Sequence, residues 1–275
     1  MPLHGSGFIL ALAVSGIVTS TVVVAADPVD RAFSARLDGS EQHYVIVLPD
    51  DFQPEAQVSV LLALHGHGSD RWQFVRDGRD ECRAAREAAA KRRLIFVAPD
   101  YRGKTSWMGP AAEADLVQII EDLKQRFRVR KIVICGGSMG GTAALTFASL
   151  HPDLIDGVVS MNGTANLVEY AGFQDAISAS FGGTKQSRPD EYRKRSAELA
   201  AERLTMPVAL TTGGRDTIVP PDSVRRLAKR LQEQNRAVRM IHQPEGGHAT
   251  NYADAIQAFD FVLERVLDAK ERPQD

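Results

Sequence analysis

Short runs of apolar residues alternate with helical patterns along most of the chain, and this alternation restricts the fold more than any other feature. The expected strands cover residues 43–49, 58–66, 94–100, 132–134, 156–163, 207–214 and 238–247. The expected helices cover 80–93, 111–127, a segment from Thr142, 221–235 and 252–267. Such alternation is typical of a mostly parallel sheet covered on both faces. Ligands bind these sheets beyond the carboxyl ends of the strands, so the residues that follow each strand are read together.

A glycine-rich turn, GGSMGG at 136–141, connects an expected strand to an expected helix and has Ser138 near its centre. Two explanations of the paired glycines are open. Either they allow close packing of the backbone, or they hold Ser138 as a nucleophile on a turn too tight for side chains on either side. A serine hydroxyl needs a base beside it, and the base needs an acceptor that fixes its tautomer. Other strand ends supply Asp216 and His248. We therefore predict that Ser138 is the nucleophile, His248 the base and Asp216 the residue that orients the base.

Acyl transfer also requires two donors for the oxyanion that forms at the substrate carbonyl. The amide of Met139, at the start of the helix after Ser138, is one candidate. The amide of His67, in the turn His65-Gly66-His67-Gly68, is the other.

These residues match the α/β-hydrolase family. The pattern Gly136-x-Ser138-x-Gly140 resembles its nucleophile elbow, and the order serine, aspartate, histidine is that family's order. From the strand at Tyr44 to the final helix, the chain is most similar to compact secreted esterases related to prolyl oligopeptidase catalytic domains and to acetyl-xylan or feruloyl esterases. The resemblance implies a doubly wound α/β fold, a mostly parallel eight-stranded sheet with helices on both faces, in one domain over 27–275.

Two departures from the family pattern stand out. The oxyanion turn reads His-Gly-His-Gly and not His-Gly-Gly-Gly, which favours His67 over Gly68 as the donor without deciding between them. Gly137, before the nucleophile, takes a position where the family often has a larger residue, and this leaves room beside Ser138. We expect His65 to hold the turn through hydrogen bonds to the backbone.

The acid and the base each have rivals. Asp222 follows two prolines and has the position of a helix N-cap, and Asp254 lies inside the last expected helix. His242 lies within the last strand, where a half-buried, hydrogen-bonded histidine is expected, whereas His248 lies in the loop beyond. Asp216 follows a strand directly, so it remains the predicted acid.

The stretch 164–204 lies where this family often inserts a cap, and here it is short and polar. A lipase lid needs a broad apolar face toward lipid, so water-soluble or polysaccharide esters are favoured over long-chain fat. Trp107 and Met108 follow a strand end and are either core residues or substrate-binding residues of the acyl or sugar pocket.

Residues 8–26 carry no charge and end in small residues, which indicates a signal peptide over 1–26 and a secreted or periplasmic protein. The stretch is also nearly long enough to span a bilayer, so an uncleaved N-terminal anchor is the alternative. Cys82 and Cys135 permit one disulfide in an exported protein, but buried free thiols are also common.

The whole chain has a formal net charge of −2 and no long basic run, which disfavours nucleic acid as a partner. No metal, cofactor or stable membrane partner is expected; the expected partner is a small-molecule or polysaccharide ester. The sequence predicts a serine carboxylic-ester hydrolase that works through an acyl-enzyme, on short-acyl or carbohydrate-linked esters. The alternatives are a prolyl oligopeptidase-type exopeptidase, disfavoured because the 275 residues hold no propeller-sized segment, and a catalytically silent binding protein on the same fold.

Overall fold

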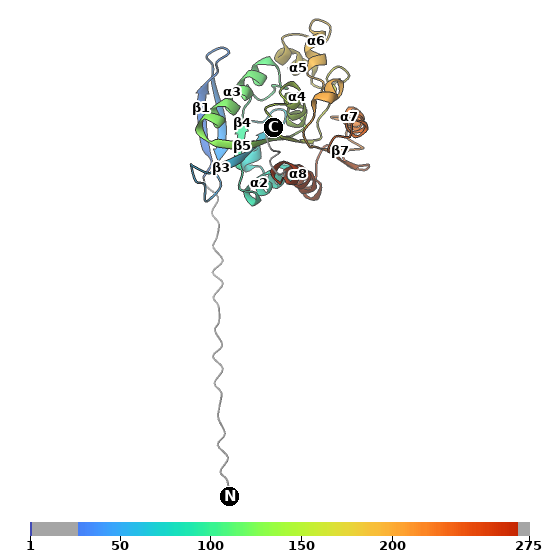
Figure 1. The fold of residues 1–275 in the computed structure, drawn as a ribbon. Coiled ribbons are helices and arrows are strands. Elements are labelled where there is room, and N and C mark those ends of the chain that lie inside the picture. Colours follow the sequence, from blue (N-terminus) through green and yellow to red (C-terminus); the bar gives the residue numbers. More distant parts are fainter. Residues whose placement is uncertain (2–26, 269–275) are drawn as a thin grey trace, which may run out of the picture.

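An eight-stranded sheet forms the centre of the protein in the computed structural model, which describes Met1 and residues 27–268 (Figure 1). The strands are β1 (Val29–Ser34), β2 (Glu41–Val47), β3 (Gln57–Leu64), β4 (Ile95–Pro99), β5 (Arg128–Gly137), β6 (Gly157–Met161), β7 (Val208–Gly213) and β8 (Val238–Gln243). Their order across the sheet is β1-β2-β4-β3-β5-β6-β7-β8. β2 pairs antiparallel with β1 and β4, and all other neighbours in the sheet are parallel. The predicted fold class is confirmed.

Helices cover both faces of the sheet, as Figure 1 shows with α3 and α4 above it and α2 and α8 below. The helices are α1 (Gln73–Arg76), α2 (Asp80–Lys91), α3 (Pro110–Arg126), α4 (Met139–Leu150), α5 (Gln174–Phe181), α6 (Pro189–Lys194), the 3₁₀ segment η1 (Ala197–Arg203), α7 (Asp222–Glu233) and α8 (Tyr252–Leu267). The central strands β3, β5 and β6 are buried on both sides. One apolar core lies between the sheet and α3, α4 and α7, and a second lies between the sheet and α2 and α8.

Strand β1 was not expected from the sequence. Its sequence, VDRAFS, contains no apolar run and no regular alternation that would predict a strand. In the structure almost all of these residues are exposed. Backbone pairing with the outer edge of β2 holds it in the sheet. Edge strands of this kind depend on their neighbour more than on their own sequence.

The predicted signal peptide covers residues 1–26, and all of these except Met1 lie outside the described residues. Within 27–268, no helix combines the length and the apolar character needed to cross a membrane. The prediction of cleavage after Ala26 therefore stays a prediction.

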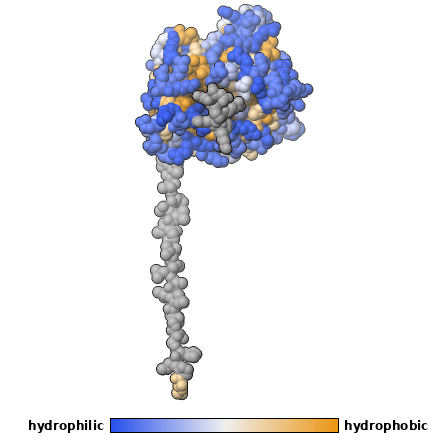
Figure 2. All heavy atoms as spheres, viewed as in Figure 1, coloured by the Kyte–Doolittle hydropathy of each residue, from blue (hydrophilic) through white to orange (hydrophobic). Residues whose placement is uncertain are grey.

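The predicted cap, 164–204, comprises α5, α6 and η1 and lies between β6 and β7 in the chain. On the face shown in Figure 2, the lobe that carries α5 and α6 is mostly hydrophilic, with small apolar patches. That surface lacks the broad apolar face that a lipase lid presents to lipid.

Candidate active site

Ser138 lies in a sharp turn between β5 and α4, with φ 57° and ψ −119°. A non-glycine residue in this sparsely populated region costs on the order of 1–3 kcal/mol, which the surroundings must offset. The Ser138 amide donates to the Met161 carbonyl oxygen at 2.8 Å, which fixes the turn against β6. A Cβ on Gly136 would lie 2.3 Å from the backbone of Gly140, and one on Gly140 would lie 2.0 Å from the Leu64 carbonyl oxygen. Both glycines are therefore required by close backbone approach, as the packing argument for this motif expects.

Three loops at the carboxyl ends of β5, β7 and β8 bring the predicted serine, aspartate and histidine together. The Nε2 atom of His248 lies 2.8 Å from Ser138 Oγ, and its Nδ1 atom lies 2.6 Å from Asp216 Oδ2. The other Asp216 oxygen, Oδ1, accepts from the amides of Ile218 and Val219, each at 2.9 Å. Because Asp216 is buried and fully hydrogen-bonded, its carboxylate holds the His248 ring with Nδ1 as the donor and Nε2 facing the serine.

None of the rival residues contacts Ser138 or His248. Asp222 is exposed and is the first residue of α7, so the predicted N-cap role was wrong: Pro221 has the cap position and its side chain makes no capping bond. Asp254, in the first turn of α8, accepts from Gln243 and Asn251. His242 is half-buried in β8 and bonds the Thr212 hydroxyl at 3.0 Å, as expected for a structural histidine.

Asn162, which sequence reasoning did not identify, holds the loop that carries His248. Its Nδ2 donates to the Gly247 carbonyl oxygen at 3.3 Å, and its Oδ1 accepts from the hydroxyls of Thr250 and Thr211. All three side chains are buried. Asn162 has φ 51° directly after β6, and asparagine tolerates this conformation better than most residues, which is the one sequence signal that could have marked it.

The His-Gly-His-Gly turn after β3 is held as predicted by the buried ring of His65. Its Nδ1 lies 2.8 Å from the Gly66 carbonyl oxygen and its Nε2 lies 3.2 Å from the Asp100 carbonyl oxygen. Burial lowers the pKa of this ring, and the neutral ring donates to one of these two oxygens at a time. The Gly68 amide donates to the Lys104 carbonyl oxygen at 2.7 Å, whereas the His67 amide has no acceptor among the described residues. This arrangement favours His67 over Gly68 as an oxyanion donor.

The second predicted donor, the amide of Met139, is the first of α4. The leading amides of a helix have no intrahelical acceptor, and they lie at its positive end. This amide is therefore available to donate a hydrogen bond to an oxyanion that forms beside Ser138.

Trp107 and Met108, the predicted substrate-binding residues, have no exposed surface. In this structure they are core residues, and the prediction that they line the pocket is corrected. Trp107 instead supports the oxyanion turn, because its Nε1 donates to His67 Nδ1 at 3.1 Å. The exposed aromatic side chain at this place is Phe173 from the cap, whose ring packs on His67 at 4.3 Å and on Trp107 at 5.4 Å between centroids.

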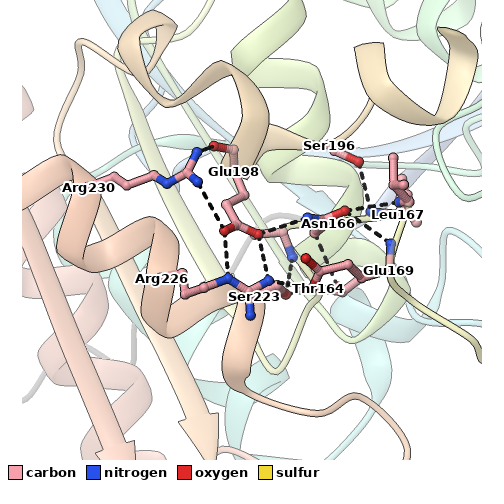
Figure 3. Close-up of polar contacts among 11 residues, drawn as sticks. Thr164, Asn166, Leu167, Glu169, Ser196, Glu198, Ser223, Arg226 and Arg230 are labelled. Atoms are coloured by element: carbon pink, nitrogen blue, oxygen red, sulfur yellow. Dashed lines mark hydrogen bonds and ion pairs between the residues drawn. The ribbon is translucent and has the colours of Figure 1, made fainter.

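The cap is fixed to α7 by an ionic network around one buried carboxylate, shown in Figure 3. Glu198 of η1 is 2% exposed; it accepts from Arg226 Nε at 2.7 Å and from Asn166 Nδ2 at 2.9 Å. Arg230 donates to the Glu198 carbonyl oxygen at 2.8 Å. The loop that contains Asn166 also contains Tyr170. The Tyr170 hydroxyl donates to the carbonyl oxygen of Ile218 at 3.0 Å, and Ile218 is two residues from Asp216. The cap thus contacts the loop of the triad acid directly.

The other titratable clusters give no second site. Within residues 27–268, no group of three His, Cys, Asp or Glu side chains is arranged to hold a metal ion. Cys82 and Cys135 are both buried free thiols, so the disulfide that the sequence left open is not formed here. A cavity of about 720 Å³ between α2 and the ends of β2 and β4 is lined by no residue of the triad.

Comparison with known proteins agrees with this geometry. The model of the prolyl oligopeptidase family, Peptidase_S9, matches residues 84–264. The chain is 24% identical over 241 residues to dipeptidyl aminopeptidase BIII of Pseudoxanthomonas mexicana, a match that covers 79% of this chain and 34% of that protein. This chain therefore spans about a third of that relative's length.

Solved structures similar to this chain include both peptidases and small hydrolases. The acylaminoacyl peptidase of Pyrococcus horikoshii matches with a TM-score of 0.69 and 16% identity, over 92% of this chain and 44% of that one. The S-formylglutathione hydrolase of Staphylococcus aureus matches with a TM-score of 0.65 and 16% identity, over 84% of this chain and 95% of that one. At these identities the likeness establishes the α/β-hydrolase fold alone.

Proposed function

The chain belongs to the prolyl oligopeptidase family of serine hydrolases, and from this premise we propose that it hydrolyses carboxylic esters through an acyl-enzyme on Ser138. The observation that carries the proposal is the continuous hydrogen-bonded relay from Ser138 through His248 to Asp216. This relay also argues against the alternative of a catalytically silent binding protein, because the nucleophile, the base and the orienting acid are all in position.

The chemistry follows from the geometry. Ser138 Oγ attacks the ester carbonyl carbon while its proton passes to His248 Nε2, and the carbonyl oxygen becomes an oxyanion held by the amides of Met139 and His67. The bond from carbon to the alcohol oxygen then breaks, and His248 returns the proton to that oxygen. Water attacks the acyl-enzyme by the same sequence of steps, which releases the acid and restores Ser138.

Short-acyl or carbohydrate-linked esters are the proposed substrates. The proposal is supported by the His248 side chain, which is 21% exposed and so reachable from solvent, and by the mostly hydrophilic cap on the face in Figure 2. Esters also need less leaving-group assistance than amides, because an alkoxide leaves more readily than an amine.

Peptide hydrolysis is the second candidate. It is favoured by the aminopeptidase and acylaminoacyl peptidase to which this chain is similar. The same relay would serve it, with His248 giving its proton to the leaving amine.

We also propose that the mature protein is exported and begins at Asp27, based on the uncharged segment that ends at Ala26. N-terminal sequencing of the protein isolated from its own cell tests this. An intact N-terminus recovered with membranes would favour the anchored form instead.

The experiment that tests the activity compares wild type with Ser138→Ala on acetyl, butyryl and long-chain nitrophenyl esters, a feruloyl ester and a dipeptide amide. We expect the highest kcat/KM on short acyl esters and a loss on the order of 10⁴-fold or more in Ser138→Ala. A fluorophosphonate adduct should map to Ser138, and an adduct on another serine would refute the assignment. A dipeptide amide cleaved as well as the best ester would favour the peptidase.

A further inference from the structure

Gly137 has room for a Cβ at ordinary van der Waals distances, and the atom nearest to that Cβ would be a carboxylate oxygen. A Cβ built on Gly137 would have no heavy atom within 3.4 Å, and its nearest neighbour would be Oε1 of Glu81, at 3.7 Å. Glu81 lies in the first turn of α2, and Gly137 is the last residue of β5. Unlike Gly136 and Gly140, Gly137 is therefore not required by backbone packing.

Glu81 is a poorly compensated charge for its degree of burial. Its side chain is 16% exposed, and the nearest cation is Arg79, with 4.0 Å between Nη1 and Oε1. Among the described residues no side chain donates a hydrogen bond to it, although Asp77 and Asp80 nearby are each bonded to arginine. Burial raises the pKa of Glu81, which the charges of Arg79 and His248 partly oppose. A ligand cation would offset the cost of ionising this carboxylate.

We expect the leaving group to lie on the side of Ser138 where Glu81 is found. The carbonyl carbon of the substrate must lie against Ser138 Oγ, with the carbonyl oxygen toward the amides of Met139 and His67. The acyl chain and the leaving group, which are the two other substituents of this carbon, then point to opposite sides. The leaving atom must be within reach of His248 Nε2, which donates its proton. The ring of Phe173 packs on His67, whereas Glu81 lies beside Gly137, the residue before the nucleophile.

We propose that Glu81 is a specificity-determining residue that favours substrates whose leaving group carries a positive charge, since Gly137 presents no side chain in front of this carboxylate. This inference rests on the proposed hydrolase function and deepens it. A cation near a largely desolvated carboxylate gains more than it would in water, because the effective dielectric constant is lower there. The preference should therefore appear in kcat/KM and should weaken as salt screens the charge.

The test uses two acetate esters of the same shape, choline acetate and 3,3-dimethylbutyl acetate, which differ in the charge of the leaving group. At low ionic strength we expect wild type to prefer the choline ester about tenfold in kcat/KM, equivalent to about 1.4 kcal/mol. Glu81→Gln should bring the ratio close to one while hydrolysis of the neutral ester continues. Glu87→Gln, an exposed position farther along α2, makes the same change of charge and should leave the ratio at its wild-type value.

A second variant tests access to Glu81 independently of the charge. Gly137→Val should lower kcat/KM for both esters, because its methyl groups would extend beyond a Cβ that already lies 3.7 Å from Oε1 of Glu81. If both esters are hydrolysed with a ratio that Glu81→Gln does not change, the inference is wrong and the hydrolase function stands. If wild type hydrolyses neither of these esters nor any of the panel above, the proposed function fails first.

Discussion

The Nε2 atom of His248 lies 2.8 Å from Oγ of Ser138, although 110 positions separate the two residues in the chain. The sheet accounts for this proximity, because parallel strands β5 and β8 end at the same edge and their following loops meet there. Asn162 then fixes the histidine loop from the end of β6. The relay is thus positioned by rigid strands, with the reacting groups on short loops.

Asp216→Asn should lower kcat by about 10⁴-fold with a small change in melting temperature, because an amide nitrogen facing His248 would stabilise the wrong tautomer of the ring. Asp222→Asn is the matched control, since Asp222 is exposed at the start of α7 and should affect turnover little. Steady-state kinetics and thermal unfolding of both variants measure the loss of kcat and the change in melting temperature. A larger loss in Asp222→Asn would show that the wrong carboxylate has been assigned.

Sequence reasoning selected Ser138, Asp216 and His248, which the structure joins by hydrogen bonds, because their signals are local. Ser138 directly follows a strand and the other two lie in the loops after β7 and β8, and the strand-end rule for parallel sheets brings such positions together without knowledge of the contacts. The same reasoning identified the His65 turn, since a histidine between a buried strand and a glycine has few roles besides bonding backbone.

Residues that act through tertiary contacts were not found in this way. Trp107 follows a strand end as His67 does, yet its ring points into the core, and the direction of a side chain after a strand cannot be read from spacing. Glu81 resembles any acidic residue in the first turn of a helix until Gly137 is placed beside it. No sequence pattern marks Phe173, because its contact with His67 joins segments that are distant in sequence.

Gly140→Ala should destabilise the protein strongly, whereas Gly137→Ala should be tolerated. A Cβ at Gly140 would lie 2.0 Å from the Leu64 carbonyl oxygen, so the backbone of β3 would have to move, at a cost of about 3 kcal/mol or more. A Cβ at Gly137 meets ordinary van der Waals distances. Urea unfolding of the two variants tests this pair, and equal stabilities would contradict the close approach of α4 to β3.

Glu113 should make the protein lose stability as the pH falls from about 4.5 to about 2. Burial raises its pKa, but the hydrogen bond with His151 and the charge of Arg195 outweigh burial and lower the pKa from 4.5 to about 2. A carboxyl group whose pKa is lower in the folded than in the unfolded protein stabilises the fold at pH values above its unfolded-state pKa. This stabilisation, here about 3 kcal/mol in all, is lost as the pH falls through the folded-state pKa. In Glu113→Gln the free energy of unfolding should be lower at pH 7 and should change less over this range. Glu233→Gln, exposed on α7, is the control and should retain the wild-type pH dependence.

Glu198→Gln should weaken both the fold and the active site, because the network in Figure 3 joins α7 to the loop that leads from Asn166 to Tyr170. Removing the charge leaves Arg226 without its ionised partner; because Arg226 is 42% exposed and can be solvated, the expected cost is about 1–2 kcal/mol. Glu169→Gln is the matched control: Glu169 also pairs with Arg226 but is 59% exposed, so its loss should cost less than about 1 kcal/mol. Because Tyr170 bonds the Ile218 backbone beside Asp216, kcat/KM of Glu198→Gln should also fall at temperatures well below its melting point. Urea unfolding and ester kinetics on both variants test the two effects separately. Full activity in a destabilised Glu198→Gln would mean that the network holds the cap in place without positioning the triad.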